Sequence, residues 1–226
     1  MDRPELTTTQ AFKMQFDSNS LLLRTTLPAQ VVGVDLSRNT VDVQPVLRGK
    51  IEGQDDTYLL PVINDVPIQY YGCNNFWVTF EPKPGDYCVL SVSDRSIEAW
   101  KKAGGIIDPV LNRHHDMTDA FAYFGINPFP DAIPSIEVDT MHVRTRDGST
   151  GIKVKANTII YDVEGVEVVN MNSAVVNFLV PVNINQTLDV TGQTTLGNVS
   201  SNNKNIGDNH AHSGVQSGGS NTGGVV

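Results

Sequence analysis

Two histidines separated by one residue, His210 and His212, are the side chains of this sequence best suited to metal chemistry. In an extended segment, side chains alternate between faces, so both imidazoles would point the same way. One chain offers too few nitrogens for most metal sites, but three chains around a threefold axis would offer six, enough for an octahedral transition metal. The alternative is that both are ordinary polar residues of a glycine-rich tail, and the motif alone does not decide.

Other residues with reactive side chains favour structural interpretations. His114, His115 and Asp116 follow one another directly, and adjacent strand residues face opposite ways, so the two histidines would not share an ion. Asp116 or Thr118 could instead cap a short helical turn. The two cysteines, Cys73 and Cys88, form no C-x-x-C pair and are interpreted as small buried side chains in a reducing compartment.

Charge and hydropathy exclude several classes of protein. The net charge of −9 and the pI near 4.9 argue against a nucleic-acid partner, because such proteins usually carry a basic surface. No apolar run approaches the roughly 18 residues of a membrane helix, and residues 1–6 lack the apolar core of a secretion signal. We therefore expect a protein that is made in a cytoplasm and carries no address of its own.

The first part of the chain predicts a helix followed by a small barrel. Residues 1–27 are expected to form a helical N-terminal extension packed on a neighbouring chain, because their apolar residues lie loosely at helical spacing. From Pro28 the apolar residues alternate, which predicts short strands and favours a closed OB-type barrel over 28–134. Predicted elements are strands near 29–31, 40–46, Leu59–Ile63, Phe76–Phe80 and Tyr87–Ser93, and a helix over Ser96–Ala103.

Residues 127–134 contain three prolines, which predicts neither a helix nor a central strand there and marks a boundary. Beyond it, over 135–204, short alternating segments broken by Gly, Asn and Asp are typical of a β-solenoid-like stalk. Such strands bury one face only, and three identical chains around one axis could cover one another's apolar side. The predicted strands lie near 136–143 and at 152–155, 166–168, 182–185 and 188–190.

The chain resembles the membrane-puncturing central baseplate spike of contractile-tail bacteriophages. The resemblance rests on four stretches, of which the histidine tail in this context is the most specific: 81–96, 113–122, 188–192 and 210–216. It implies an all-β fold in which an N-terminal OB-fold barrel precedes an intertwined trimeric β-helix and a small metal-capped apex over 205–226. Ser213 stands where we would expect a glycine.

The resemblance also implies partners and a metal. His210 and His212 of three chains would hold one iron (Fe) per homotrimer, the N-terminal domain would bind the tail tube or hub protein, and the host outer membrane would be the mechanical target. The protein would thus belong to the virion and would not be an enzyme. The alternatives are a metal-dependent enzyme or an envelope-degrading hydrolase that uses the His-x-His site. However, no Asp or Glu follows His212, and Glu81, Asp86 and Asp94 lie in predicted turns without an evident pocket.

Overall fold

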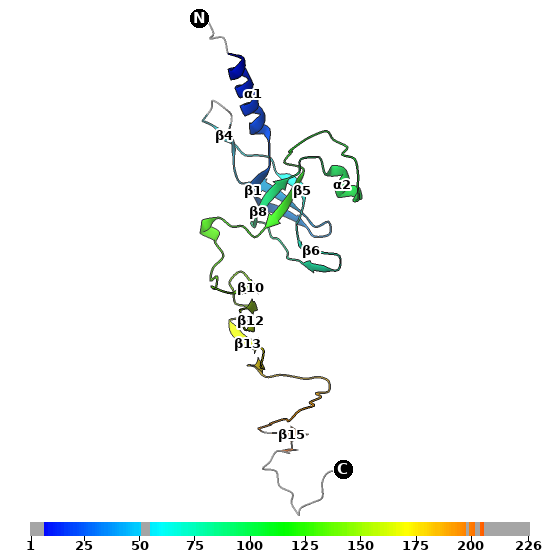
Figure 1. Cartoon of the computed structure of the whole chain (residues 1–226), viewed down its shortest axis with the longest axis vertical. Coiled ribbons are helices and arrows are strands. Elements are labelled where there is room, and N and C mark those ends of the chain that lie inside the picture. Colours follow the sequence, from blue (N-terminus) through cyan, green and yellow to red (C-terminus); the bar gives the residue numbers. More distant parts are fainter. Residues whose placement is uncertain (1–6, 51–54, 198, 202–203, 206–226) are drawn as a thin grey trace, which may run out of the picture. The chain divides into compact units, whose positions relative to one another are not determined.

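The computed structural model describes residues 7–50, 55–197, 199–201 and 204–205. The chain divides into two compact units, Met1–Glu137 and Val138–Val226, so the division falls just beyond the proline-rich segment. Figure 1 labels α1, β1, β5 and β8 in the first unit and β10, β12 and β13 in the second.

Helix α1 (Thr8–Leu22) begins at a capping box. Thr7 Oγ1 accepts a hydrogen bond from the Gln10 backbone N–H at 3.3 Å, and Gln10 Oε1 accepts one from the Thr7 N–H at 2.9 Å. This reciprocal pair satisfies two donors that the first helical turn would otherwise leave free. The helix ends at Leu23, which is already extended.

The first unit is built on a five-stranded antiparallel sheet with the order β5-β2-β1-β8-β9. An isolated parallel bridge joins Ile68 to Ala122, and the Gln69 N–H donates to the Ala122 carbonyl at 2.9 Å, so the two edges of the sheet are linked. The strands are β1 (Thr26–Asp35), β2 (Thr40–Pro45), β5 (Ile63–Pro67), β8 (Tyr87–Val92) and β9 (Ala120–Phe124).

The core of this unit comes largely from alternation along its strands, interrupted at irregularities in β1 and β2. Leu27, Ala29 and Val31 of β1 are buried, while the residues between them are half-buried. Val41 and Val43 of β2, Val66 of β5 and Leu90 of β8 complete the cluster and are at most 1% exposed. Period-two alternation therefore sends most of these apolar side chains to one side of the sheet, where they form a shared core.

The first unit also contains two short hairpins and a second helix outside the five-stranded sheet. Two hairpins pair β3 (Gly49–Lys50) with β4 (Thr57–Tyr58) and β6 (Tyr71–Cys73) with β7 (Phe76–Val78). Helix α2 (Glu98–Ala103) ends at Gly104, whose φ of 65° suits glycine. The turn at 81–86 packs on β1, because the Gly85 N–H donates to Val31 O and the Val31 N–H to Asp86 O.

Three sequence predictions for this unit are wrong in detail. No strand occupies Leu59–Ile63, since β5 begins at Ile63 and Pro61 has no N–H to donate to a sheet. A non-helical turn that leads into strand β9 lies where a capped helical turn was predicted. Residues Phe129–Asp131 form one turn of 3₁₀-helix, which prolines tolerate near a helix start because their φ is already helical.

The second unit contains a five-stranded antiparallel meander in the order β10-β11-β12-β13-β14. Glu164 and Gly165 form the tight β12–β13 turn, with φ values of 52° and 80°. The strands are β10 (Met141–Arg144), β11 (Gly151–Val154), β12 (Ile159–Val163), β13 (Val166–Met171) and β14 (Val176–Phe178), and a short pair, β15 (Ser200–Ser201) with β16 (Lys204–Asn205), follows. The strands predicted at 182–185 and 188–190 are absent: the described chain is irregular there.

Candidate functional site

The second sheet separates its side chains into two chemically distinct faces. Residues directly opposite each other on neighbouring strands share a face, so the register of the four strand pairs defines rows that cross the whole meander. Two rows consist of apolar residues alone, and we call them the apolar face: Val143, Ile152, Tyr161, Val169 and Phe178, and Met141, Val154, Ile159, Met171 and Val176.

The opposite side, the polar face, carries charged and amide side chains. Lys153 Nζ lies 2.8 Å from an Asp162 carboxylate oxygen, and Asn177 Nδ2 donates to Asn170 Oδ1 at 2.9 Å. Asn170 in turn donates to Glu167. The first contact joins β11 to β12 and the second joins β13 to β14, so both link neighbouring strands across the polar face.

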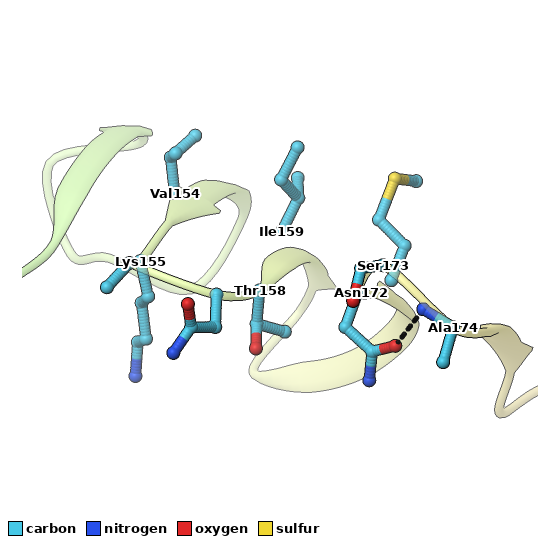
Figure 2. A pocket seen from close by; sticks show the side chains of 10 residues that line it. Val154, Lys155, Thr158, Ile159, Asn172, Ser173 and Ala174 are labelled. Carbon is cyan, nitrogen blue, oxygen red and sulfur yellow. Dashed lines mark hydrogen bonds between the residues drawn. The ribbon is translucent and has the colours of Figure 1, made fainter.

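The two faces can be followed at the loop end of the sheet. Figure 2 shows Val154 and Ile159 pointing to one side, and Lys155, Thr158 and Asn172 pointing to the other. Asn172 Oδ1 accepts a hydrogen bond from the Ala174 N–H at 2.8 Å, which fixes the β13–β14 turn. These residues line an open hollow between the β11–β12 and β13–β14 turns. The apolar face therefore reaches the end of the sheet.

In an ordinary sheet with one covered face, the apolar face is buried and the polar face is exposed. Here the apolar face is the more exposed of the two. Asp162 on the polar face is only 8% exposed, whereas Met141 and Val143 are each 64% exposed and Phe178 is 60% exposed. Burying one such apolar side chain fully contributes about 1.5–3 kcal/mol. An uncovered face of this size is typical of a surface that another protein chain occupies.

The exposed apolar pattern continues beyond the sheet. Val180, Val182 and Ile184 alternate with polar or small residues and are between 39% and 55% exposed, and Leu188 is 65% exposed. None of these residues belongs to an assigned strand of the described chain. Their period of two nevertheless suits strands whose partners come from elsewhere.

The metal site predicted from the sequence, His210 and His212, lies outside the described residues. Within the ranges that the structure does describe, no group of three or more His, Cys, Asp or Glu side chains could hold a metal ion. The geometry of the two histidines is therefore not given by the structure, and their role stays a prediction.

The His114-His115-Asp116 stretch has structural contacts. His115, at φ 51°, places Nδ1 3.2 Å from the Arg24 carbonyl oxygen. Asp116 Oδ1 accepts hydrogen bonds from the Thr118 N–H at 2.9 Å and from its hydroxyl at 2.6 Å. These bonds form a turn that leads into β9, so Asp116 caps a turn, as one alternative predicted, although no helix follows.

Sequence reasoning missed Asp119, the most buried carboxylate of the described chain at 1% exposure. It accepts hydrogen bonds from the Ile97 N–H and the Arg113 guanidinium, both at 2.9 Å, and from the Ser96 hydroxyl. Burial alone would raise the pKa of Asp119, but the Arg113 and Ile97 hydrogen bonds outweigh it and hold the pKa below its ordinary value of 3.8. An Asp just before the continuous apolar run 120–124 was the available signal.

The two cysteines differ in environment. Cys88 of β8 is fully buried, and burial raises the pKa of its thiol to about 11. Cys73 at the end of β6 is exposed. The prediction of buried cysteines is therefore right for Cys88 and wrong for Cys73, which lies in a hairpin outside the core.

The comparisons with known proteins concern the first unit. Residues 27–125 match the family model of the phage protein Gp138 N-terminal domain, a span that runs from β1 to the end of β9. A comparison with curated proteins finds no match. No described helix is both long and apolar enough to span a membrane. Over less than half of its length the chain is thus similar to a phage protein domain, which supports a structural protein of the phage tail or baseplate.

Proposed function

We propose that the chain is the central spike of a contractile phage tail, a homotrimer that is driven mechanically through the host outer membrane when the sheath contracts. The observation that carries the proposal is the apolar face of the second sheet, which one chain leaves exposed. The match of residues 27–125 to a phage domain supplies the biological setting. The role is structural, and the protein resides in the virion.

The first unit is an OB-type barrel in this proposal. Five antiparallel strands in the order β5-β2-β1-β8-β9, with a parallel bridge that links the two edges, support a small closed barrel. Closure removes open strand edges. The barrel is the platform that binds the tail tube or hub protein.

The second unit is the stalk. Three chains that wind into a β-helix around one axis would cover one another's apolar faces and give the alternating segment 179–190 its missing strand partners. Each chain carries −9, so a trimer carries 3 × (−9) = −27, and apolar burial between chains must outweigh this repulsion. Axial load would then be carried by many interchain backbone hydrogen bonds.

His210 and His212 are the iron ligands at the apex. Two imidazoles from each of three chains make a six-nitrogen donor set that suits an octahedral first-row metal, and the choice of iron rests on the resemblance. When bound, the metal ties three chain ends together. Structural metals in small sites contribute on the order of 10 kcal/mol, which would order segments as glycine-rich as 217–224.

A role other than catalysis fits the ionisable groups that the structure describes. The carboxylate of Asp119 is satisfied by Ile97, Arg113 and Ser96, and Asp116 is engaged by Thr118. Both carboxylates stabilise loops. Neither is left free to act as a general acid or base.

Elemental analysis combined with light scattering tests the proposal. We expect a particle of about 74 kDa, three times the 24.6 kDa chain, with one transition metal per trimer. Replacing His210 and His212 together by alanine should remove the metal and leave the trimer intact, whereas His114→Ala should leave both unchanged. A stable monomer would overturn the spike, and full metal retention in the double variant would overturn the ligand assignment.

A further inference from the structure

The described side chains of α1 are uncovered. Residues 7–16 are all exposed, with Phe12 and Phe16 at 72% each, and Leu23 at the C-terminal cap is 55% exposed. Two aromatic rings in water on one short helix are costly, since burying each would contribute about 1.5–3 kcal/mol. The helix therefore needs a neighbour that the described part of its own chain does not supply.

Two of the exposed apolar residues of α1, Phe12 and Phe16, fall on one narrow stripe together with Thr9. Phe12 lies three residues after Thr9 and four before Phe16, and these intervals are successive a and d positions of a heptad repeat. At about 100° per residue the three positions lie within roughly 60° of each other around the helix, whereas Met14 lies on the opposite side. Leu23 is the extended C-cap and lies beyond the helix.

Isolated, α1 would be only marginally stable. It has 15 residues and includes Thr, Ser, Asn and Asp, which are weak helix formers. Helices of this length rarely persist alone in water. The capping box at Thr7 and Gln10 fixes where the helix begins but supplies little further stability, so most of it must come from packing along the stripe.

Copies of α1 fit this stripe because of how the helix is tied to the barrel. Only Leu23, Arg24 and Thr25 separate α1 from β1, and the Thr25 carbonyl accepts a hydrogen bond from the Val92 N–H at 2.8 Å. The Arg24 carbonyl contacts His115. A linker this short and this firmly held would keep three α1 helices at high effective concentration in a trimer.

The charge of α1 also favours packing against copies of itself. Between Thr8 and Leu22 the helix contains one basic and one acidic residue, Lys13 and Asp17. Three identical copies of this segment would not repel one another, although the whole chain carries −9. The neutral helix is therefore a segment that can self-associate with little electrostatic cost.

We propose that three copies of α1 pack along Thr9, Phe12 and Phe16 as a short parallel three-stranded coiled coil. The proposal rests on the homotrimer proposed above and goes beyond it, because it assigns a second self-association surface at the other end of the chain. The coiled coil sets the three chains in register before the stalk.

Disulfide trapping tests the seam directly. In a Cys73→Ser background, whose remaining Cys88 is buried, Phe12→Cys and Phe16→Cys each place a thiol on the stripe, and Met14→Cys places one on the opposite face as the matched control. In a three-stranded seam, thiols at one level come within disulfide range, so mild oxidation should convert roughly two thirds of the chains to covalent dimers. Met14→Cys should give at least tenfold less.

Light scattering on the same reduced samples distinguishes a failure of the coiled coil from a failure of the homotrimer. A trimer in which neither stripe cysteine cross-links, or in which Met14→Cys cross-links equally well, would overturn the coiled coil and leave the spike standing. Such a result would place the stripe against a different protein. A monomeric particle would overturn both. Using two stripe positions guards against one substitution that unfolds α1.

Discussion

The two sheets use the same local pattern and reach opposite results. Alternation in β1, β2 and β8 places Ala29, Val43 and Leu90 at 0% exposure inside a sheet whose edges are linked, whereas alternation in β10–β14 leaves Val143 and Phe178 at least 60% exposed. The first sheet curls on itself, so one chain completes its core. The second is a meander whose apolar face the described chain leaves largely exposed. Period-two patterning specifies a face but not what covers that face.

The largest effect on a single chain is expected in the first sheet. Leu90→Ala should lower the free energy of unfolding by about 2–5 kcal/mol, because it leaves a cavity in a closed core. Both tryptophans, Trp77 and Trp100, lie in the first unit, so urea denaturation followed by tryptophan fluorescence reports on this unit. The loss should not depend on protein concentration, since the core forms within one chain.

The matched control is Val89→Ala, the adjacent residue of β8, which is half-buried on the other side of the strand. It should cost less than half as much as Leu90→Ala. Equal losses for the two variants would mean that the apolar core of the first sheet does not carry the stability of the unit.

A smaller effect is expected for the buried carboxylate of Asp119. Asp119→Asn should cost about 1–3 kcal/mol at pH 7, because the amide is uncharged and cannot accept all the hydrogen bonds from Arg113, Ile97 and Ser96. The folded pKa of Asp119 lies below 3.8, so its stabilisation is present above that pH and disappears as the pH falls through the folded value.

Urea midpoints measured between pH 7 and pH 2.5 check this linkage. The gap between the wild-type protein and Asp119→Asn should be constant above about pH 4.5 and should narrow below pH 3.8. The exposed Asp94, beside Arg95, gives the control variant Asp94→Asn. This substitution should change the free energy of unfolding by less than about 0.5 kcal/mol at pH 7. A gap that widens in acid would contradict the ion-pair account.

The smallest effect concerns the two thiols. Cys73 should react with a disulfide reagent at pH 8 within minutes, while Cys88, whose pKa burial raises to about 11, should stay unreacted until the protein unfolds. Thiol titration with and without urea gives the two counts. Two reactive thiols in the native protein would show that the core of the first sheet opens readily.

Sequence reasoning was strong where one chain supplies both partners of a contact. The alternating residues of β1, β2 and β8 predicted their strands, because the period-two pattern lies within each segment. It failed at 59–63, where Pro61 interrupts the pairing, and at β9, whose place in the sheet depends on a bridge to the distant Ile68. It also failed for the contacts of Asp119, which join residues 22 and 23 positions apart.

The candidate site was predicted only in outline. An apolar side that needs cover was expected from residues 135–204, but the two rows of the apolar face depend on strand register. Register follows from turns such as Glu164-Gly165 and from the irregularity between Tyr161 and Asp162. Composition alone cannot place these, because a shift by one residue exchanges the two faces. His210 and His212 remain a prediction from the sequence.

Cover of the apolar face by copies of the chain is the central claim, and one pair of variants tests it most directly. Phe178 and Asn177 are neighbours on β14, both are exposed, and they lie on opposite faces. Phe178→Asp would bury three carboxylates in a trimer interface, at a cost of several kcal/mol each, whereas Asn177→Asp would place the same charge on the polar face. Light scattering across a dilution series should give a trimer near 74 kDa for the wild type and Asn177→Asp and smaller species for Phe178→Asp. An unchanged trimer in Phe178→Asp, or a wild-type monomer, would contradict the account.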